Sequence, residues 1–501
     1  MRSKKAIINI STSLILQIVM IISGFIIPRL IISRFGSNVN GLITSITQFL
    51  AYITLLESGL GPVVKSVLYK PIANNDMNMI KRILKASDSF FKKISYIFIF
   101  YIIILCILYP FMVQKQFSVM YTWPLVVIIA ISTFAEYYFG MTYGLFLQSK
   151  QKTYVVSLIR TGTIILNTIL TIILVKLNFG IHLIKLCSAL ILTIRPILQN
   201  LYVKKKYNIN LKEIKNDYAI EQKWDGLAQH IAYVIHSNTD IVLLTLFSTT
   251  IEVSVYSVYL LVVNGIKSLV QGFLGGIDAS FGDMIAKNEK NSLNKAYSNF
   301  ELCYFSIITI IFITTLLLII PFVSVYTYDI IDANYIRPLF AYLMVISEFI
   351  WAIRQPYNEL VKASGSFKET KKGAWIEAIT NFVISIILIK KLGIIGVAIG
   401  TVIAMLIRTV ELIYYTSKNI LKRDIKISIK KMLIIIFEFG LVILIVKFIP
   451  TFKITSYLTW IIQAIIIFTI SVIVVLIMNW ILYKAEVLEI IKMLKSIKKK
   501  I

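Results

Sequence analysis

Long apolar runs separated by short polar loops repeat from one end of the sequence to the other. The first covers about residues 7–32, and the following runs centre near residues 50, 104, 134, 165, 192, 237, 267, 311, 349, 382, 404, 440 and 469. Each is about as long as the twenty residues that a helix needs to cross a bilayer. The pattern predicts an all-α polytopic membrane protein with about fourteen transmembrane helices.

A duplication organises the first twelve of these predicted helices. A shift of 214 positions places Tyr143 on Tyr357 and lays NTILTIILVK over NFVISIILIK without a gap. We interpret this as a tandem duplication of about 210 residues. Six helices per copy is an even number, so both copies insert into the membrane with the same orientation. The sequence therefore predicts two six-helix parallel repeats, an N-lobe and a C-lobe, around a central cavity.

The predicted domain boundaries follow from this duplication. They are an N-lobe over 1–210, a C-lobe over 211–425, two accessory spans over 426–483 and a cytoplasmic tail over 484–501. The accessory spans fall outside the duplication, and we expect them at the periphery. In the tail, isoleucine and leucine alternate with lysine. This pattern is typical of a basic amphipathic helix on the inner leaflet, or of a solvated charged tail.

The composition agrees with a membrane location and indicates the orientation. The chain is 58% hydrophobic and 15% charged, and its mean hydropathy is +0.81. The net charge of +27 lies in short loops, such as the one holding Arg423 and Lys431, and not in a folded basic domain. Nucleic acid is therefore not an expected partner. Because lysine and arginine concentrate on the cytoplasmic side, the alternation predicts a multi-pass plasma-membrane protein with both termini in the cytoplasm.

The sequence offers little for catalysis or metal binding. Cys106, Cys187 and Cys303 lie inside apolar runs, and the three histidines are scattered, so we expect no disulfide framework, metal site or cofactor. ATPase motifs and catalytic constellations are also missing, which favours a protein that is not an enzyme.

Charged residues inside predicted spans are candidates for function, because a charge at the bilayer centre is unfavourable. Asp240 and Lys267 lie on adjacent predicted helices, both about 20 Å from the inner surface. They form either a structural ion pair or a site in which Lys267 attracts a passing anion and Asp240 gates or binds a proton. Arg354, like Lys267, has no counterpart in the other repeat, which makes both residues stronger candidates for a role in function.

Other polar residues in the spans indicate a function less specifically. Four charges recur in both repeats and are therefore more typical of helix-to-helix contacts: Glu136, Glu348, Arg195 and Arg408. Asn9, Ser13 and Gln17 form a stripe that faces either water or another helix. The clusters from Gly59 to Pro62 and from Gly272 to Gly276 interrupt apolar helices at matching places. Such paired interruptions are typical of the moving part of a transporter.

Three stretches resemble one known family. They are FGSNVNGLITSITQFLAYITLLESGLGP at 35–62, LYKPIANND at 68–76 and GSFKETKKGAWIEAITNFVISIILIKKLGIIGVAIGT at 365–401. They look like the polysaccharide transporter (Wzx-type flippase) family, in the same superfamily as the multidrug and toxin extrusion exporters and the lipid II flippases. The resemblance implies a cavity lined largely by spans 1, 2, 7 and 8. On this chain those spans carry Asn9, Gln17, Arg29, Glu57, Lys65, Asp240 and Lys267.

The resemblance also implies a function and partners. It predicts a flippase that moves an undecaprenyl-pyrophosphate-linked oligosaccharide from the inner to the outer leaflet by alternating access, for surface polysaccharide synthesis. Its partners would be this substrate, membrane lipids, and a polysaccharide polymerase and glycosyltransferases. Candidates to bind the diphosphate or the sugars are Lys267, Arg354, Arg29, Lys65, Gln17 and Asn9, and candidates for coupling or gating are Asp240 and Glu57. A drug or metabolite cation antiporter and a non-transporting scaffold for polysaccharide enzymes remain alternative interpretations.

Overall fold

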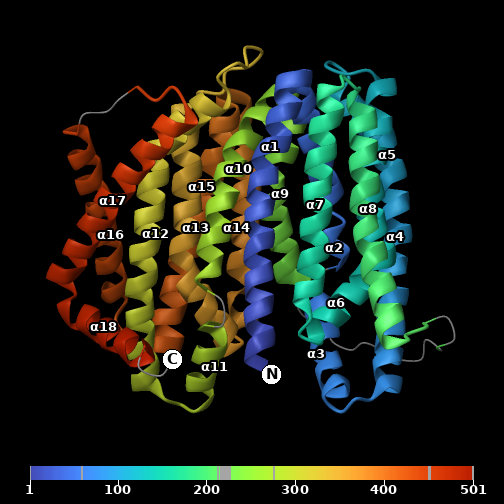
Figure 1. The fold of residues 1–501 in the computed structure, drawn as a ribbon. Coiled ribbons are helices and arrows are strands. Elements are labelled where there is room, and N and C mark those ends of the chain that lie inside the picture. The colour runs from blue at the N-terminus through green and yellow to red at the C-terminus, as the bar shows by residue number, and fades with distance from the viewer. Residues whose placement is uncertain are drawn as a thin grey trace. The chain divides into compact units, whose positions relative to one another are not determined.

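The computed structural model describes residues 2–57, 60–211, 214, 227–274, 277–449 and 453–498. Every regular element in these residues is a helix, which confirms the predicted all-α class (Figure 1). The chain forms two compact units. The first contains Met1–Ser257 and Ile330–Ala333, and the second contains Val258–Asp329 and Asn334–Ile501. The predicted lobe boundaries at 210 and 425 stay a prediction from the duplication.

The first unit is built from long helices around a continuous apolar core. Its elements are α1 (Arg2–Ala51), α2 (Thr54–Glu57), α3 (Leu60–Ala73), α4 (Met77–Val113), α5 (Val119–Ala135), the π-helical segment η1 (Glu136–Gly140), α6 (Met141–Ser149), α7 (Thr153–Lys176), α8 (Ile181–Tyr207), α9 (Leu227–Phe247) and the start of α10 (Thr250–Gly272). Helix α1 packs along α7, and α8 packs against both α7 and α5. Leu42, Val64, Leu84 and Phe146 are fully buried in the core of this unit.

Helix α1 joins the first two predicted spans across a sharp break at Gly36. The backbone φ of Gly36 is +85°, a value that residues with a Cβ rarely adopt. A Cβ there would also lie 2.9 Å from Asp332 Oδ2. That carboxylate accepts hydrogen bonds from the backbone N–H of Ser37 at 2.6 Å and from its hydroxyl at 2.7 Å. The short segment Ile330–Ala333 therefore belongs to the first unit through its contact with the α1 break.

The second unit holds the rest of the helices. They are the remainder of α10, α11 (Ile277–Ala286), α12 (Lys290–Tyr326), α13 (Pro338–Ser364), α14 (Phe367–Leu392), α15 (Ile394–Tyr415), the π-helical segment η2 (Thr416–Leu421), α16 (Ile425–Lys447), α17 (Tyr457–Leu482) and α18 (Lys484–Lys498). Helices α14 and α15 pack closely because glycines face the partner helix: a Cβ on Gly400 would lie 2.4 Å from Ser385 Oγ. Helix α12 packs against α13, α16, α17 and α18.

A helix covers the position of each predicted span. By length and composition, ten helices in the described part of the chain can cross a membrane, and the first of these, Ile8–Glu57, includes two predicted spans. Helices α13 and α16 are not among the ten, and both carry several charged residues. The protein is therefore a multi-pass membrane protein, and its total of about fourteen spans stays a prediction.

The predicted tail forms α18, which packs against α12 and α17. Lys295 of α12 forms a salt bridge with Glu489 of α18. The hydrogen bond from Lys295 lowers the pKa of the Glu489 carboxyl. Leu488 and Met493 are exposed on this helix, while the side chains from Ser496 to Ile501 lie outside the described residues. Whether the helix lies on a lipid surface stays a prediction.

Candidate functional site

Lys267 in α10 lies against α13 and pairs with an acid on that helix. Its Nζ is 3.0 Å from Glu348 Oε2 and 3.2 Å from Oε1. The same ammonium lies 4.7 Å from the centre of the Trp351 ring, a cation–π contact. The side chain of Lys267 is 24% exposed and that of Glu348 is 9% exposed. The lysine is thus positioned by α13 and still reaches the surface of its unit.

Arg354, the second predicted anion ligand, is buried in a network between α13, α14 and α15. It forms a salt bridge with Glu377, and both side chains are 8% exposed. Arg408 Nε lies 4.0 Å from Glu377 Oε2, and its Nη1 donates to the carbonyl of Thr370 at 2.7 Å and to Glu411. Because the guanidinium of Arg354 is buried against this carboxylate, its observed contact is helix-to-helix.

A third cluster surrounds Glu301 of α12, which is completely buried. Arg423 Nη2 lies 2.8 Å and 2.9 Å from its two carboxylate oxygens, and Lys431 Nζ lies 2.9 Å from Oε2. Tyr357 donates its hydroxyl to Oε1 at 2.6 Å. The charge pattern of the sequence places Arg423 and Lys431 in a cytoplasmic loop and does not single out Glu301. The available signal was an isolated glutamate near the beginning of the ninth apolar run.

In the first unit, the two predicted gating acids each accept a hydrogen bond from a tyrosine. The Tyr137 hydroxyl donates to Glu57 Oε2 at 2.9 Å. Asp240 of α9, 6% exposed, accepts from the Tyr256 hydroxyl at 2.8 Å. Asp240 and Lys267 belong to different units, and inside its own unit each has another partner. Their proposed pairing and the proposed roles of Glu57 and Asp240 in gating or coupling stay predictions.

The polar stripe at the start of α1 faces another helix over part of its length. Asn9 accepts from the backbone N–H of Tyr154 at 2.9 Å and donates to the carbonyl of Gln151 at 3.1 Å. Ser13 lies 3.5 Å from Ser157, one turn further along α7. Asn9 therefore satisfies backbone groups where α7 begins. Gln17 is partly exposed on the same stripe.

Two further predicted cations occupy partly buried positions in the first unit. Arg29 lies in α1 directly after Pro28, a proline inside that helix, and Lys65 lies in α3. Both side chains are intermediate in exposure. Their predicted contacts with a diphosphate or with sugars stay predictions. Of the glycine clusters, Gly59, Gly275, Gly276 and the side chain of Pro62 lie outside the described residues.

The repeat-related charges of the first unit also lie between helices. Arg160 Nη2 of α7 is 3.7 Å from Glu136 Oε1, at the start of η1. Arg195 Nε of α8 donates to the Thr163 hydroxyl at 3.5 Å. The π-helical turn η1 packs closely on α8, because a Cβ on Gly140 would lie 2.6 Å from the Cβ of Pro196. Such turns occur often where a helix is locally adapted to a function.

Metal binding has no candidate in the described part of the chain. No group of three or more His, Cys, Asp or Glu residues lies there in an arrangement that could hold a metal ion.

No protein-family model and no curated protein sequence matches this chain, whereas solved structures do. The structure of "Lipid II flippase MurJ, inward closed conformation" matches with a TM-score of 0.67 at 17% identity, covering 95% of this chain and 99% of that one. An inward-facing multidrug resistance MATE family transporter of the MOP superfamily matches with a TM-score of 0.51 at 13% identity, covering 82% of this chain and 98% of that one. The Vibrio cholerae MATE transporter VcmN in the bent form matches with a TM-score of 0.51 at 15% identity, covering 83% of this chain and 97% of that one.

These similar proteins are transporters and not enzymes, and the matches extend over nearly their whole length. At such low identity, the likeness concerns the fold. The chain therefore has the fold of the membrane transporters of the MOP superfamily.

Proposed function

We propose that this chain is a flippase for a polyprenyl-diphosphate-linked oligosaccharide, moving an undecaprenyl-pyrophosphate-linked repeat unit from the inner to the outer leaflet of the plasma membrane. The observation that carries the proposal is the coverage of the structural matches. The lipid II flippase covers 95% of this chain, whereas the MATE transporters above cover 82% and 83%. A lipid-linked cargo is thus favoured by the structure that accounts for almost the whole chain.

Lys267 is the residue we expect to meet the diphosphate first. Its pairing with Glu348 and its contact with Trp351 offset the cost of a charge inside the membrane when no substrate is bound. Because the lysine is 24% exposed, an anion can approach it without unfolding its surroundings. Exchange of Glu348 for a phosphate oxygen would then keep the ammonium neutralised throughout the movement.

Arg354 has a different expected role in this proposal. Its buried salt bridge with Glu377 supports a structural function in holding α13 against α14. Asn9 likewise has a supporting role, because its amide bonds the backbone where α7 begins. Gln17, Arg29 and Lys65 remain candidates for contacts with the sugars or the diphosphate.

A cation antiporter is the second candidate function. The fold it shares with MATE transporters and the membrane-embedded acids Glu57 and Asp240 favour it. A scaffold that gathers a polysaccharide polymerase and glycosyltransferases at the inner surface is compatible with transport. The cytoplasmic location of both termini belongs to the same proposal.

The experiment is a leaflet-exposure assay in proteoliposomes. A polyprenyl-diphosphate oligosaccharide is placed in one leaflet, and its accessibility from the other side is measured with and without the protein. Faster exposure with the wild-type protein, reduced in Lys267→Ala, is the expected result. If the protein does not accelerate the exposure of several different glycans, in a preparation that still shows a cooperative unfolding transition, the flippase proposal is rejected and the antiporter is favoured.

A further inference from the structure

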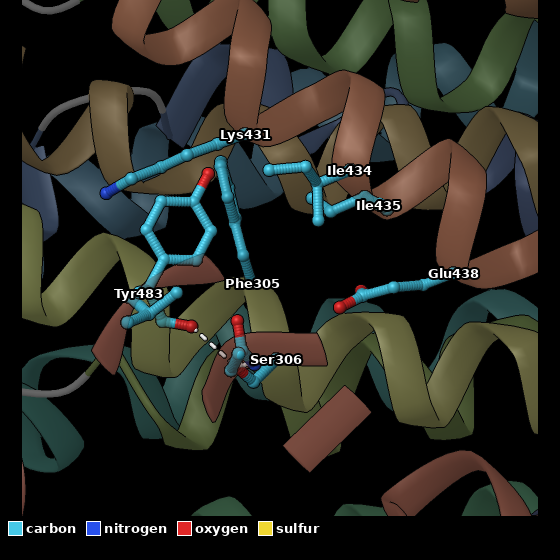
Figure 2. A pocket seen from close by; sticks show the side chains of 9 residues that line it. Phe305, Ser306, Lys431, Ile434, Ile435, Glu438 and Tyr483 are labelled. Carbon is cyan, nitrogen blue, oxygen red and sulfur yellow. Dashed lines mark hydrogen bonds between the residues drawn. The ribbon is translucent and has the colours of Figure 1, made fainter. Parts of the chain in front are cut away.

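A small pocket lies in the second unit, between α12, α16 and the end of α17 (Figure 2). It is small and partly open to its surroundings. Part of its wall is apolar, from Phe305, Ile434 and Ile435, and the polar part includes Ser306 and Glu438. The function proposed above uses none of these residues.

Glu438 is the unusual member of this pocket. It lies in the interior of α16 (Ile425–Lys447) and is 2% exposed. Figure 2 shows its carboxyl group pointing into the pocket. Oε1 is buried and accepts no hydrogen bond from the described residues. An ionised carboxylate in this position would lack the partners that normally offset the loss of water.

The nearby charges are engaged elsewhere. Lys431 lies two helical turns before Glu438 on α16, but its ammonium bonds Glu301 Oε2 at 2.9 Å, and the carbonyl and hydroxyl of Ser298 at 3.2 Å and 3.1 Å. A lysine has three donors, and these contacts use them. Arg423 is likewise bound to Glu301. The centre of the Tyr483 ring lies 5.9 Å from Lys431 Nζ, and both residues line the pocket.

Two buried acids on neighbouring helices, Glu301 and Glu438, therefore have different surroundings. Glu301 has two cations and a tyrosine hydroxyl around it, which stabilise the ionised form. Glu438 faces apolar side chains and an amide–hydroxyl pair, in which Asn479 Nδ2 donates to Ser306 Oγ at 2.9 Å. This environment favours the neutral acid over the carboxylate.

A metal ion fits the pocket less well than a proton. Hard cations bound by oxygen take about six ligands, and the polar wall offers few oxygens besides the Glu438 carboxyl. Ser306 already donates its hydroxyl to the carbonyl of Leu302 at 2.7 Å. We propose that Glu438 is a proton-binding site of the accessory helices, which holds a proton while α12, α16 and α17 pack as they do here and releases it when water enters the pocket.

The site links proton concentration to helix packing. Because the proton binds the packed arrangement more tightly than the opened one, low pH favours packing and high pH favours opening. This linkage does not depend on which substrate the protein carries.

Infrared difference spectroscopy of the protein in lipid nanodiscs tests the proposal. The carbonyl band of a protonated carboxylic acid is expected in the wild type, absent in Glu438→Gln and retained in Glu489→Gln, a carboxyl on α18. Raising the pH from about 6 to about 10 should remove the band reversibly in the wild type, a titration that needs no variant to fold.

Thermal unfolding gives an independent readout. The wild type should lose stability with rising pH relative to Glu438→Gln, because only the wild type acquires a charge at this buried position. A band that is missing at about pH 6, or that persists over the whole titration, would overturn the proposal. A shift of this carbonyl band when sodium replaces choline at constant pH would also overturn the proposal, in favour of a metal-ion site.

Discussion

Replacing Arg354 by methionine separates a structural role of this arginine from a role in substrate binding. Arg354 and Glu377 form a salt bridge with both side chains 8% exposed. Removing one partner of such a pair costs about 3–5 kcal/mol, because a buried charge is left behind. Arg408 Nε remains 4.0 Å from Glu377, although Thr370 and Glu411 already occupy its Nη1. We therefore expect Arg354→Met to lower the free energy of unfolding by about 3 kcal/mol, near the lower end of this range.

The assay is the free energy of unfolding in mixed micelles, measured for a double-mutant cycle. The double variant Arg354→Met, Glu377→Met should recover to within about 1 kcal/mol of the wild type, because both charges are removed together. Lys391→Met, at an exposed position near the end of α14, controls for the substitution itself. A single Arg354→Met variant with wild-type stability and no flipping would refute the structural assignment.

Other contacts give three further predictions. In the leaflet-exposure assay, Lys267→Ala should slow flipping by about ten-fold to a hundred-fold, because it removes a charge-assisted hydrogen bond worth about 1.5–3 kcal/mol. An unchanged rate would exclude Lys267 as a phosphate ligand. Glu301→Gln should lower the free energy of unfolding by about 3–5 kcal/mol, because two buried cations lose their counter-charge; a cost below about 1 kcal/mol would contradict the burial argument. Gly41→Ala should destabilise by at least about 1–3 kcal/mol, since its Cβ would lie 1.7 Å from the carbonyl oxygen of Thr250, whereas the matched control Gly24→Ala, with open space around it, should not.

The sequence predicted the helices more completely than their contacts. Apolar runs long enough to cross a bilayer leave few alternatives to a helix, and a helix lies at every predicted position. The break of α1 at Gly36 agrees with the two separate spans that the sequence predicts, but its position was not predicted, because it depends on a positive φ and on the distant Asp332. Residue counting gives the depth of Asp240 and Lys267, but the direction in which each side chain points depends on helix rotation. For that reason Glu348 was not foreseen as the partner of Lys267.

Buried charges in this protein differ in how completely they are satisfied, and this difference is the best guide to function. Glu301 has two cations and a tyrosine hydroxyl around it, which stabilise its ionised form. Lys267 has one acid and one ring, and part of its surface stays exposed. Glu438 has an oxygen without a hydrogen-bond donor among the described residues. A group with incomplete partners gains most from a ligand, so a substrate anion at Lys267 and a proton at Glu438 are the changes to which this fold should respond.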